Sequence, residues 1–224
     1  MSFFKVNKEE ANKAEGGNFI SQSGIYDITI QAITVDVNDK DARTLGLYIE
    51  HNGSPQMMYG AIKLDNNDGT PNFQAPIFNK LIVIADLDDV NDPIEAELPI
   101  GEKKAMKDVA ILEDFCDLEV KMRVQNEYSI YGDWSPKKGQ IQEKRVIKGF
   151  YRADGAVPAE FDDESKFGTQ LGKDEAYADN ITYKDGLTAE DVTEWIKNGR
   201  EGGPSGSTTS TTAAAPKKKS FGKK

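Results

Sequence analysis

The sequence predicts a mainly β protein: an OB-like antiparallel Greek-key barrel with one inserted helix, followed by a C-terminal extension that is partly helical and partly disordered. Three observations predict this fold class. Apolar and polar residues alternate in several short β-branched runs, clusters of turn-forming residues separate these runs, and one helical pattern follows the third run. A two-sheet sandwich would use the same strands, so the architecture stays open between the two.

The first three strands form a predicted meander. The first covers residues 24–37, and its alternation shifts at Ala32-Ile33, which indicates a bulge or bend. Residues 43–51 and 56–64 follow as the second and third strands, and Asn52-Gly53 between them favours a type I′ hairpin turn. Short turns of this kind join strands that pair antiparallel.

A helix is predicted within residues 73–85, because apolar side chains recur there at spacings of one, three and four residues. The β-branched residues in this run keep a strand open as the alternative. Residues 86–108 are acidic and rich in turn formers, with Pro93 and Pro99 among them, so we expect a loop.

Alternation resumes at Ile111-Leu112 and over Phe115 to Val124, and it predicts a strand with one apolar face and one charged face. The apolar face is Leu118, Val120, Met122 and Val124, and the charged face is Glu119, Lys121, Arg123 and Gln125. We expect this strand to continue to residue 131, a loop over 132–139 and a returning strand over 141–151. Further on, Thr188 and Asp191 predict the capped start of a helix that ends at Gly199.

Composition divides the chain into four expected segments. An N-terminal arm spans 1–22, the OB-like domain spans 23–155, an acidic extension with a short helix spans 156–201, and a disordered Lys-rich tail spans 202–224.

Several classes of function lack the residues that they need. One cysteine and one histidine cannot make an internal disulfide or a four-ligand structural zinc site. His51 stands beside a predicted turn, and the sequence has neither a nucleophile elbow nor a phosphate-binding glycine loop. The acidic stretch 86–92 lacks the spacing of a calcium loop, and 162–164 is interpreted as a solvated charge run. We therefore expect no enzymatic activity, no cofactor and no metal.

The sequence also lacks an apolar run long enough to span a membrane and a secretory signal at the first residues. A cytoplasmic protein is expected.

Charge is unevenly distributed along the chain. The 38 acidic and 28 basic residues give a net charge of −10, which by itself argues against a polyanionic partner. Residues 121–152, however, hold eight Lys or Arg residues against three acidic ones. The only charged side chains of residues 204–224 are lysines. The sequence thus places one basic segment and one basic tail in an acidic protein.

The basic segment also carries aromatic residues, and single-stranded nucleic acid needs both cations for its phosphates and flat rings on which unpaired bases stack. We expect Trp134, Tyr128 and Tyr131 to be the stacking platforms. Lys121 and Arg123 would flank one groove, and the loop that carries Trp134, Lys137 and Lys138 would close over it. The full candidate set is Lys121, Arg123, Tyr128, Tyr131, Trp134, Lys137, Lys138, Lys144, Arg145, Lys148 and Tyr151. The residues alone leave a second interpretation open, in which Phe150 and one tyrosine fill the core and the lysines only solubilise a hairpin.

The order of four segments resembles the bacteriophage-encoded single-stranded DNA-binding proteins. These segments are 24–30 (GIYDITI), 69–73 (GTPNF), 118–121 (LEVK) and 149–155 (GFYRADG), and the resemblance covers roughly residues 20–160. It implies an OB-fold that coats single-stranded DNA during phage replication and recombination in the host cytoplasm, with other phage replication or recombination proteins as partners. The chain departs from the wider class in ending with lysines, where an acidic tail closed by an aromatic residue is common.

A competing hypothesis remains: a structural or protein–protein interaction protein, for example a phage assembly factor with a β-sandwich domain, whose hairpin contacts another protein.

Overall fold

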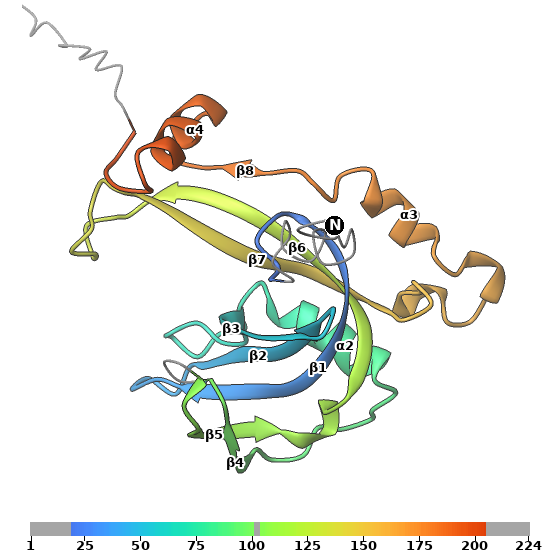
Figure 1. Cartoon of the computed structure of the whole chain (residues 1–224). Coiled ribbons are helices and arrows are strands. Elements are labelled where there is room, and N and C mark those ends of the chain that lie inside the picture. Colours follow the sequence, from blue (N-terminus) through green and yellow to red (C-terminus); the bar gives the residue numbers. More distant parts are fainter. Residues whose placement is uncertain (1–18, 101–103, 205–224) are drawn as a thin grey trace, which may run out of the picture. The chain divides into compact units, whose positions relative to one another are not determined.

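The computed structural model describes residues 19–100 and 104–204, so most of the expected arm and tail, 1–18 and 205–224, lies outside the described residues. The described chain is mainly β, as the sequence predicts. Its strands form one antiparallel sheet of eight strands in which β1 pairs with three neighbours (Figure 1). Within the described residues this sheet is unclosed, so closure into a barrel is not observed.

The described residues divide into two compact units. The first comprises 19–100, 104–128 and 143–182, and the second comprises 129–142 and 183–204. The long strands β6 (Leu118–Ile130) and β7 (Ile141–Arg152) pair with each other and pass from the first unit into the second.

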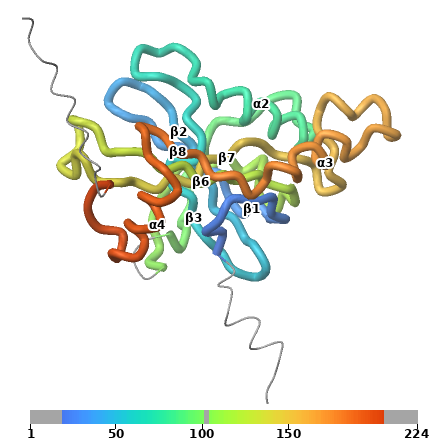
Figure 2. The backbone as a smooth tube through the Cα atoms, turned by 90° about the horizontal axis from the view of Figure 1, so that it is seen from above, coloured from blue at the N-terminus to red at the C-terminus, as the bar shows by residue number. Residues whose placement is uncertain are grey.

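The predicted meander is confirmed. It consists of β1 (Gly24–Val37), β2 (Arg43–His51) and β3 (Ser54–Lys63), which follow one another along the chain in Figure 2. Asn52 and Gly53 have φ angles of 49° and 74°, and positive values at both positions are what a type I′ turn requires. The tight turn at Asn52 and Gly53 therefore explains why β2 pairs antiparallel with β3.

The bulge in β1 changes the partners of that strand. On one edge β1 pairs with β6 through residues 24–30 and, past the bulge, with β5 (Lys107–Leu112), whereas on the other edge β2 pairs with β1 on both sides of the bulge. The register shift lies between Ile30 and Ala32, one residue from the predicted position.

The core of the first unit lies against the inner face of β1. Ile30, Ile33, Leu47 and Met122 are fully buried there. The helix α2 (Ala75–Ile84) adds its apolar side, as predicted, and the Phe78 ring packs on Phe115 with 5.4 Å between centroids.

The predicted loop over 86–108 is wrong in part, because it contains the strand β4 (Ile94–Leu98) paired with β5. This strand has five residues and two exposed glutamates, Glu95 and Glu97, so its alternation is too short and too charged to stand out. Such composition is typical of an edge strand, and β4 is at one end of the sheet order. A 3₁₀ turn (Glu113–Phe115) then precedes β6 where the sequence predicted the start of that strand.

The second unit contains the end of the β6–β7 hairpin and the helix α4 (Ala189–Lys197). Thr188 accepts a hydrogen bond from the Asp191 backbone N–H, and the Asp191 carboxylate accepts from Thr188, so the predicted capping box is confirmed. The short strand β8 (Thr182–Tyr183), which pairs with β6, leads toward α4. Ile141, Val192 and Trp195 are buried here.

Residues 202–204 belong to this unit, although the sequence placed them in a disordered tail. The Ile141 N–H donates to the Gly202 carbonyl over 3.1 Å. A Cβ atom at Gly203 would lie 2.4 Å from the Gly139 carbonyl oxygen, so only glycine allows this approach.

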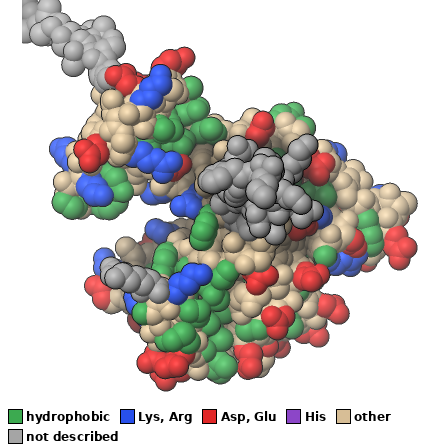
Figure 3. Space-filling model, in the orientation of Figure 1, with side chains coloured by type: hydrophobic (Ala, Val, Ile, Leu, Met, Phe, Trp, Pro, Cys, Tyr) green, Lys and Arg blue, Asp and Glu red, His purple; other side chains and the backbone are tan. Residues whose placement is uncertain are grey.

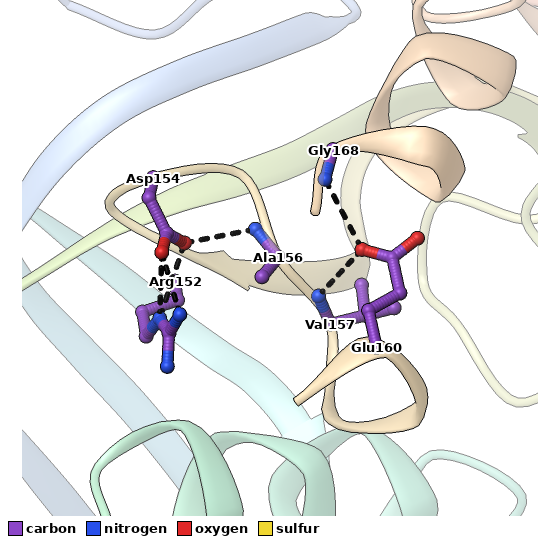
Figure 4. Close-up of polar contacts among 6 residues, drawn as sticks. All are labelled: Arg152, Asp154, Ala156, Val157, Glu160 and Gly168. Carbon is purple, nitrogen blue, oxygen red and sulfur yellow. Dashed lines mark hydrogen bonds and ion pairs between the residues drawn. The ribbon is translucent and has the colours of Figure 1, made fainter. Parts of the chain in front are cut away.

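In the first unit, the chain that leaves β7 is held by Arg152. Its guanidinium donates to the Asp154 carboxylate, which also accepts from the Ala156 N–H (Figure 4). The same guanidinium lies over the rings of Phe161 and Phe167, at 4.6 and 4.7 Å from their centroids. One cation thus ties the end of a strand to the irregular segment that follows.

Glu160 organises the same segment from the inside. Its side chain is 7% exposed and accepts hydrogen bonds from the backbone N–H groups of Val157 and Gly168 (Figure 4) and from that of Gln170. Glu160 ends a 3₁₀ turn (Pro158–Glu160), a second turn (Glu164–Lys166) follows, and Gln170 lies in the helix α3 (Thr169–Glu175), which the sequence did not predict.

Replacing this carboxylate tests its structural role. Glu160→Ala removes the acceptor for three backbone donors, so we expect the free energy of unfolding to fall by about 2 kcal/mol. The matched control Glu164→Ala changes an exposed glutamate of the same segment and should stay within about 0.5 kcal/mol of the parent protein. Urea unfolding measures both, and equal losses would contradict the role of Glu160.

Candidate functional site

The end of the β6–β7 hairpin, residues 131–140, presents two aromatic rings and is called the hairpin loop below. The Trp134 side chain is 76% exposed, and its ring meets Tyr131 edge to face with 6.1 Å between centroids. The backbone closes the loop through hydrogen bonds from Tyr131 N–H to Gln140 and from Gly139 N–H to Tyr131, both 2.9 Å. The tryptophan is therefore exposed on a loop with defined geometry.

Two lysines follow Trp134 in the hairpin loop. Lys137 is exposed, and its ammonium has no partner within the described part of the chain. The Lys138 ammonium lies 2.8 Å from Asp133, with both side chains largely exposed. Such a pair contributes little and exchanges readily for another anion. Figure 3 shows basic, hydrophobic and acidic side chains together at this end of the hairpin.

Three cations on the strands of the first unit form ion pairs with carboxylates, whereas the sequence predicted that cations there would face a groove for nucleic acid. Lys121 lies 2.5 Å from Asp27, Arg123 lies 2.7 Å from Asp174, and the Lys148 ammonium lies 2.7 Å from a Glu127 carboxylate oxygen. A nucleic-acid phosphate would have to displace a carboxylate at each position. These residues are poorer phosphate ligands than their sequence pattern suggested.

Asp174 receives three donors. Arg123, the Tyr151 hydroxyl at 2.7 Å and the Gln170 amide at 3.1 Å all donate to its carboxylate. Burial raises the pKa of Asp174, but the hydrogen bonds from Tyr151 and Gln170 and the Arg123 charge outweigh it, and the pKa falls below its usual value. Burial, followed by the bond to Asp174, raises the pKa of Tyr151.

Two of the three expected tyrosines lie in the interior, which corrects the sequence-based assignment. Tyr128 is 4% exposed and donates to Glu143, and Tyr151 is 3% exposed. Neither ring has a free face for a base in this structure. Phe150 is also buried, as the alternative interpretation expected.

Lys144 and Arg145, on β7 in the first unit, are exposed. Arg145 donates one N–H to the Ile20 carbonyl over 2.8 Å, which leaves other guanidinium donors facing outward. The Lys144 side chain has no partner among the residues that the structure describes.

A pocket of about 320 Å³ opens on the first unit near Arg145. Its lining comes from five separate parts of the sequence, so no local pattern could have revealed it. The lining residues are Phe19, Tyr48, Pro55, Gln56, Met57, Pro99, Ile100, Lys104 and Arg145.

His51 has a local structural partner. Its Nδ1 lies 2.8 Å from the Asp27 carbonyl oxygen, and its ring meets Tyr26 edge to face. Across the described ranges no group of three His, Cys, Asp or Glu side chains has the arrangement of a metal site. No helix in those ranges is both long enough and apolar enough to cross a bilayer.

No protein-family model, curated protein sequence or solved structure gives a significant match to this chain. Function therefore has to be argued from the geometry above.

The Asp174 cluster predicts a pH dependence. The folded pKa of Asp174 lies below the unfolded value, so its stabilisation is complete above about pH 4 and is lost as the pH falls through the folded pKa. Asp174→Asn should lower the free energy of unfolding by about 1–2 kcal/mol at neutral pH, and this difference should shrink toward pH 3. Denaturant unfolding across that pH range measures it.

Asp179→Asn is the matched control, because Asp179 is exposed on the same segment. A deficit for Asp174→Asn that stays constant down to pH 3, or one equal to that of the control, would refute the assigned role.

Proposed function

We propose that this protein binds single-stranded DNA without enzymatic turnover and with little sequence preference, as a coating protein in the replication or recombination of phage DNA. One observation carries the proposal: the hairpin loop holds an exposed tryptophan and a second ring beside two lysines that are exchangeable or unpaired. Stacking on exposed rings and phosphate contacts from lysines are the two interactions that single strands offer irrespective of sequence.

The charge distribution supports a restricted binding surface. The protein as a whole is acidic, with a net charge of −10, so a DNA strand is repelled by most of the surface. Basic side chains outnumber acidic ones in the hairpin loop. We infer that the loop is one place where a strand approaches, and that affinity falls steeply with added salt.

The strand arrangement supports an OB-like relationship. In such a barrel one long bent strand belongs to two parts of the sheet, and β1 has this property because its partner on one edge changes from β6 to β5 at the bulge. The sandwich alternative would need two separate face-to-face sheets.

The direct test compares a labelled oligothymidine with a duplex of equal length by fluorescence anisotropy over a salt series. We expect tighter binding of the single strand and a loss of affinity with salt. Equal affinity for the two forms, or binding indifferent to salt, would reject the proposal. A defined protein partner from infected cells, together with no DNA binding, would favour the interaction-protein hypothesis.

Trp134→Ala should weaken oligothymidine binding by about tenfold, because stacking contributes about 1–3 kcal/mol per base. The salt dependence should change little, since no charge is removed. Phe73→Ala, which removes an aromatic side chain that is 82% exposed on another element, is the control and should bind like the parent. Equal effects of the two substitutions would rule out the tryptophan as a specific platform.

The double variant Lys137→Ala/Lys138→Ala should reduce the slope of log affinity against log salt by about 0.7 for each lost phosphate contact. The control pair Lys40→Ala/Lys80→Ala removes two exposed lysines from other loops and helices. Anisotropy titrations at several salt concentrations give both slopes. An unchanged slope in the hairpin variant, or the same reduction in both pairs, would contradict the phosphate role.

A further inference from the structure

We propose that the pocket on the first unit, defined above by its nine lining residues, is a second contact point for single-stranded DNA that seats one nucleotide. This inference rests on the proposed function and adds a site that the sequence did not indicate.

The floor of the pocket belongs to the regular β2–β3 ladder. Tyr48 stands opposite Met57 in the register of these strands, so both side chains project from the same face. A Cβ atom at Gly46 would lie 2.5 Å from the Met57 methyl, so this methyl occupies the space that a side chain at position 46 would need. Tyr48 and Met57 thus give an aromatic and apolar floor supported by a sheet.

One wall is fixed by Ile20, which is 1% exposed. Its N–H donates to the Gln56 side chain over 3.0 Å, and its carbonyl accepts from Arg145 over 2.8 Å. These two bonds hold the neighbouring residue Phe19 at the rim, where its ring is 57% exposed.

The opposite wall is the segment after β4. The Tyr59 hydroxyl donates to the Ile100 carbonyl over 2.5 Å and so ties this segment to β3. Pro99 and Ile100 line the pocket here, and Lys104 brings a cation to the same side. Both walls are therefore attached to the strands that form the floor.

The charges of the lining match a phosphate. Lys104 and Arg145 contribute two cations, and no acidic side chain is among the described lining residues, although the whole chain has ten more acidic than basic residues. Arg145 retains donors beyond the one used on Ile20.

The remaining lining is mostly aromatic or apolar, with Phe19 and Tyr48 as ring surfaces for a base. A volume of about 320 Å³ is at the small end for ligand pockets, which fits one nucleotide better than a folded partner.

The test uses the full chain and two double variants. Phe19→Ala/Lys104→Ala removes a rim ring and a cation, and Phe73→Ala/Lys80→Ala removes the same two residue types from exposed positions around α2. We expect the pocket variant to bind a labelled oligothymidine about tenfold more weakly than the parent, and the control to bind like the parent. Circular dichroism and the unfolding midpoint verify that both variants are folded.

A second measurement does not depend on substitution. Photo-cross-linking of the parent protein with oligothymidine containing 5-iodouracil should label a peptide that contains Phe19 or Tyr48, and excess unlabelled oligothymidine should abolish the label. Thymidine monophosphate at equal nucleotide concentration should compete far less, because a strand also gains the contacts of its neighbouring nucleotides.

The outcomes separate the two proposals. If the parent protein binds no oligothymidine, the proposed function is rejected and the pocket assignment with it. If the parent binds, Trp134→Ala weakens binding, and the pocket variant matches its control without cross-links in the pocket, only the pocket assignment is overturned. Monophosphate competing as well as the oligonucleotide would make this a free-nucleotide site and would also overturn it.

Discussion

The strand β1 has to supply backbone hydrogen bonds to three neighbours, and this requirement shapes the first unit. On one edge it pairs with β6 before the bulge and with β5 after it, and on the other edge it pairs with β2, so a single bend directs two parts of the sheet around one core. The bulge lets the strand change direction while its apolar residues, including Ile30 and Ile33, remain buried. The meander begins with β1, and both β6 of the β6–β7 hairpin and β2, which carries Tyr48 of the pocket, pair directly with it.

Acidic side chains from β1, β6 and α3 pair with three cations of β6 and β7. Asp27, Asp174 and Glu127 each pair with a cation that the sequence had made a candidate for phosphate binding. Arg123 gains a partly buried site with Tyr151 and Gln170 around a shared carboxylate, and such a network is costly to open because every member would lose its partner. The number of Lys and Arg residues in a segment is therefore a poor measure of how much positive charge is available to bind a polyanion.

The two surfaces proposed to contact a single strand each combine an exposed ring with cations that keep donors available or pair only at the surface. The hairpin loop has Trp134 exposed beside Lys137 and Lys138, and the pocket has Phe19 and Tyr48 beside Lys104 and Arg145. The loop follows directly from the sequence, because its residues are consecutive. The pocket does not, because its lining residues are as far apart as positions 19 and 145.

The sequence by itself determined the elements whose signals are local. Alternation gave β1, β2 and β6, Asn52-Gly53 gave the tight turn, and Thr188 with Asp191 gave the start of α4, because each depends on side chains within a few residues. Only the tertiary structure decided which cations are paired and which rings are buried, as with Tyr128, since ion pairs and burial depend on residues distant in the chain. The short charged strand β4 was also decided by the tertiary structure. Its own sequence has no strong alternation, and it is a strand because it pairs with β5.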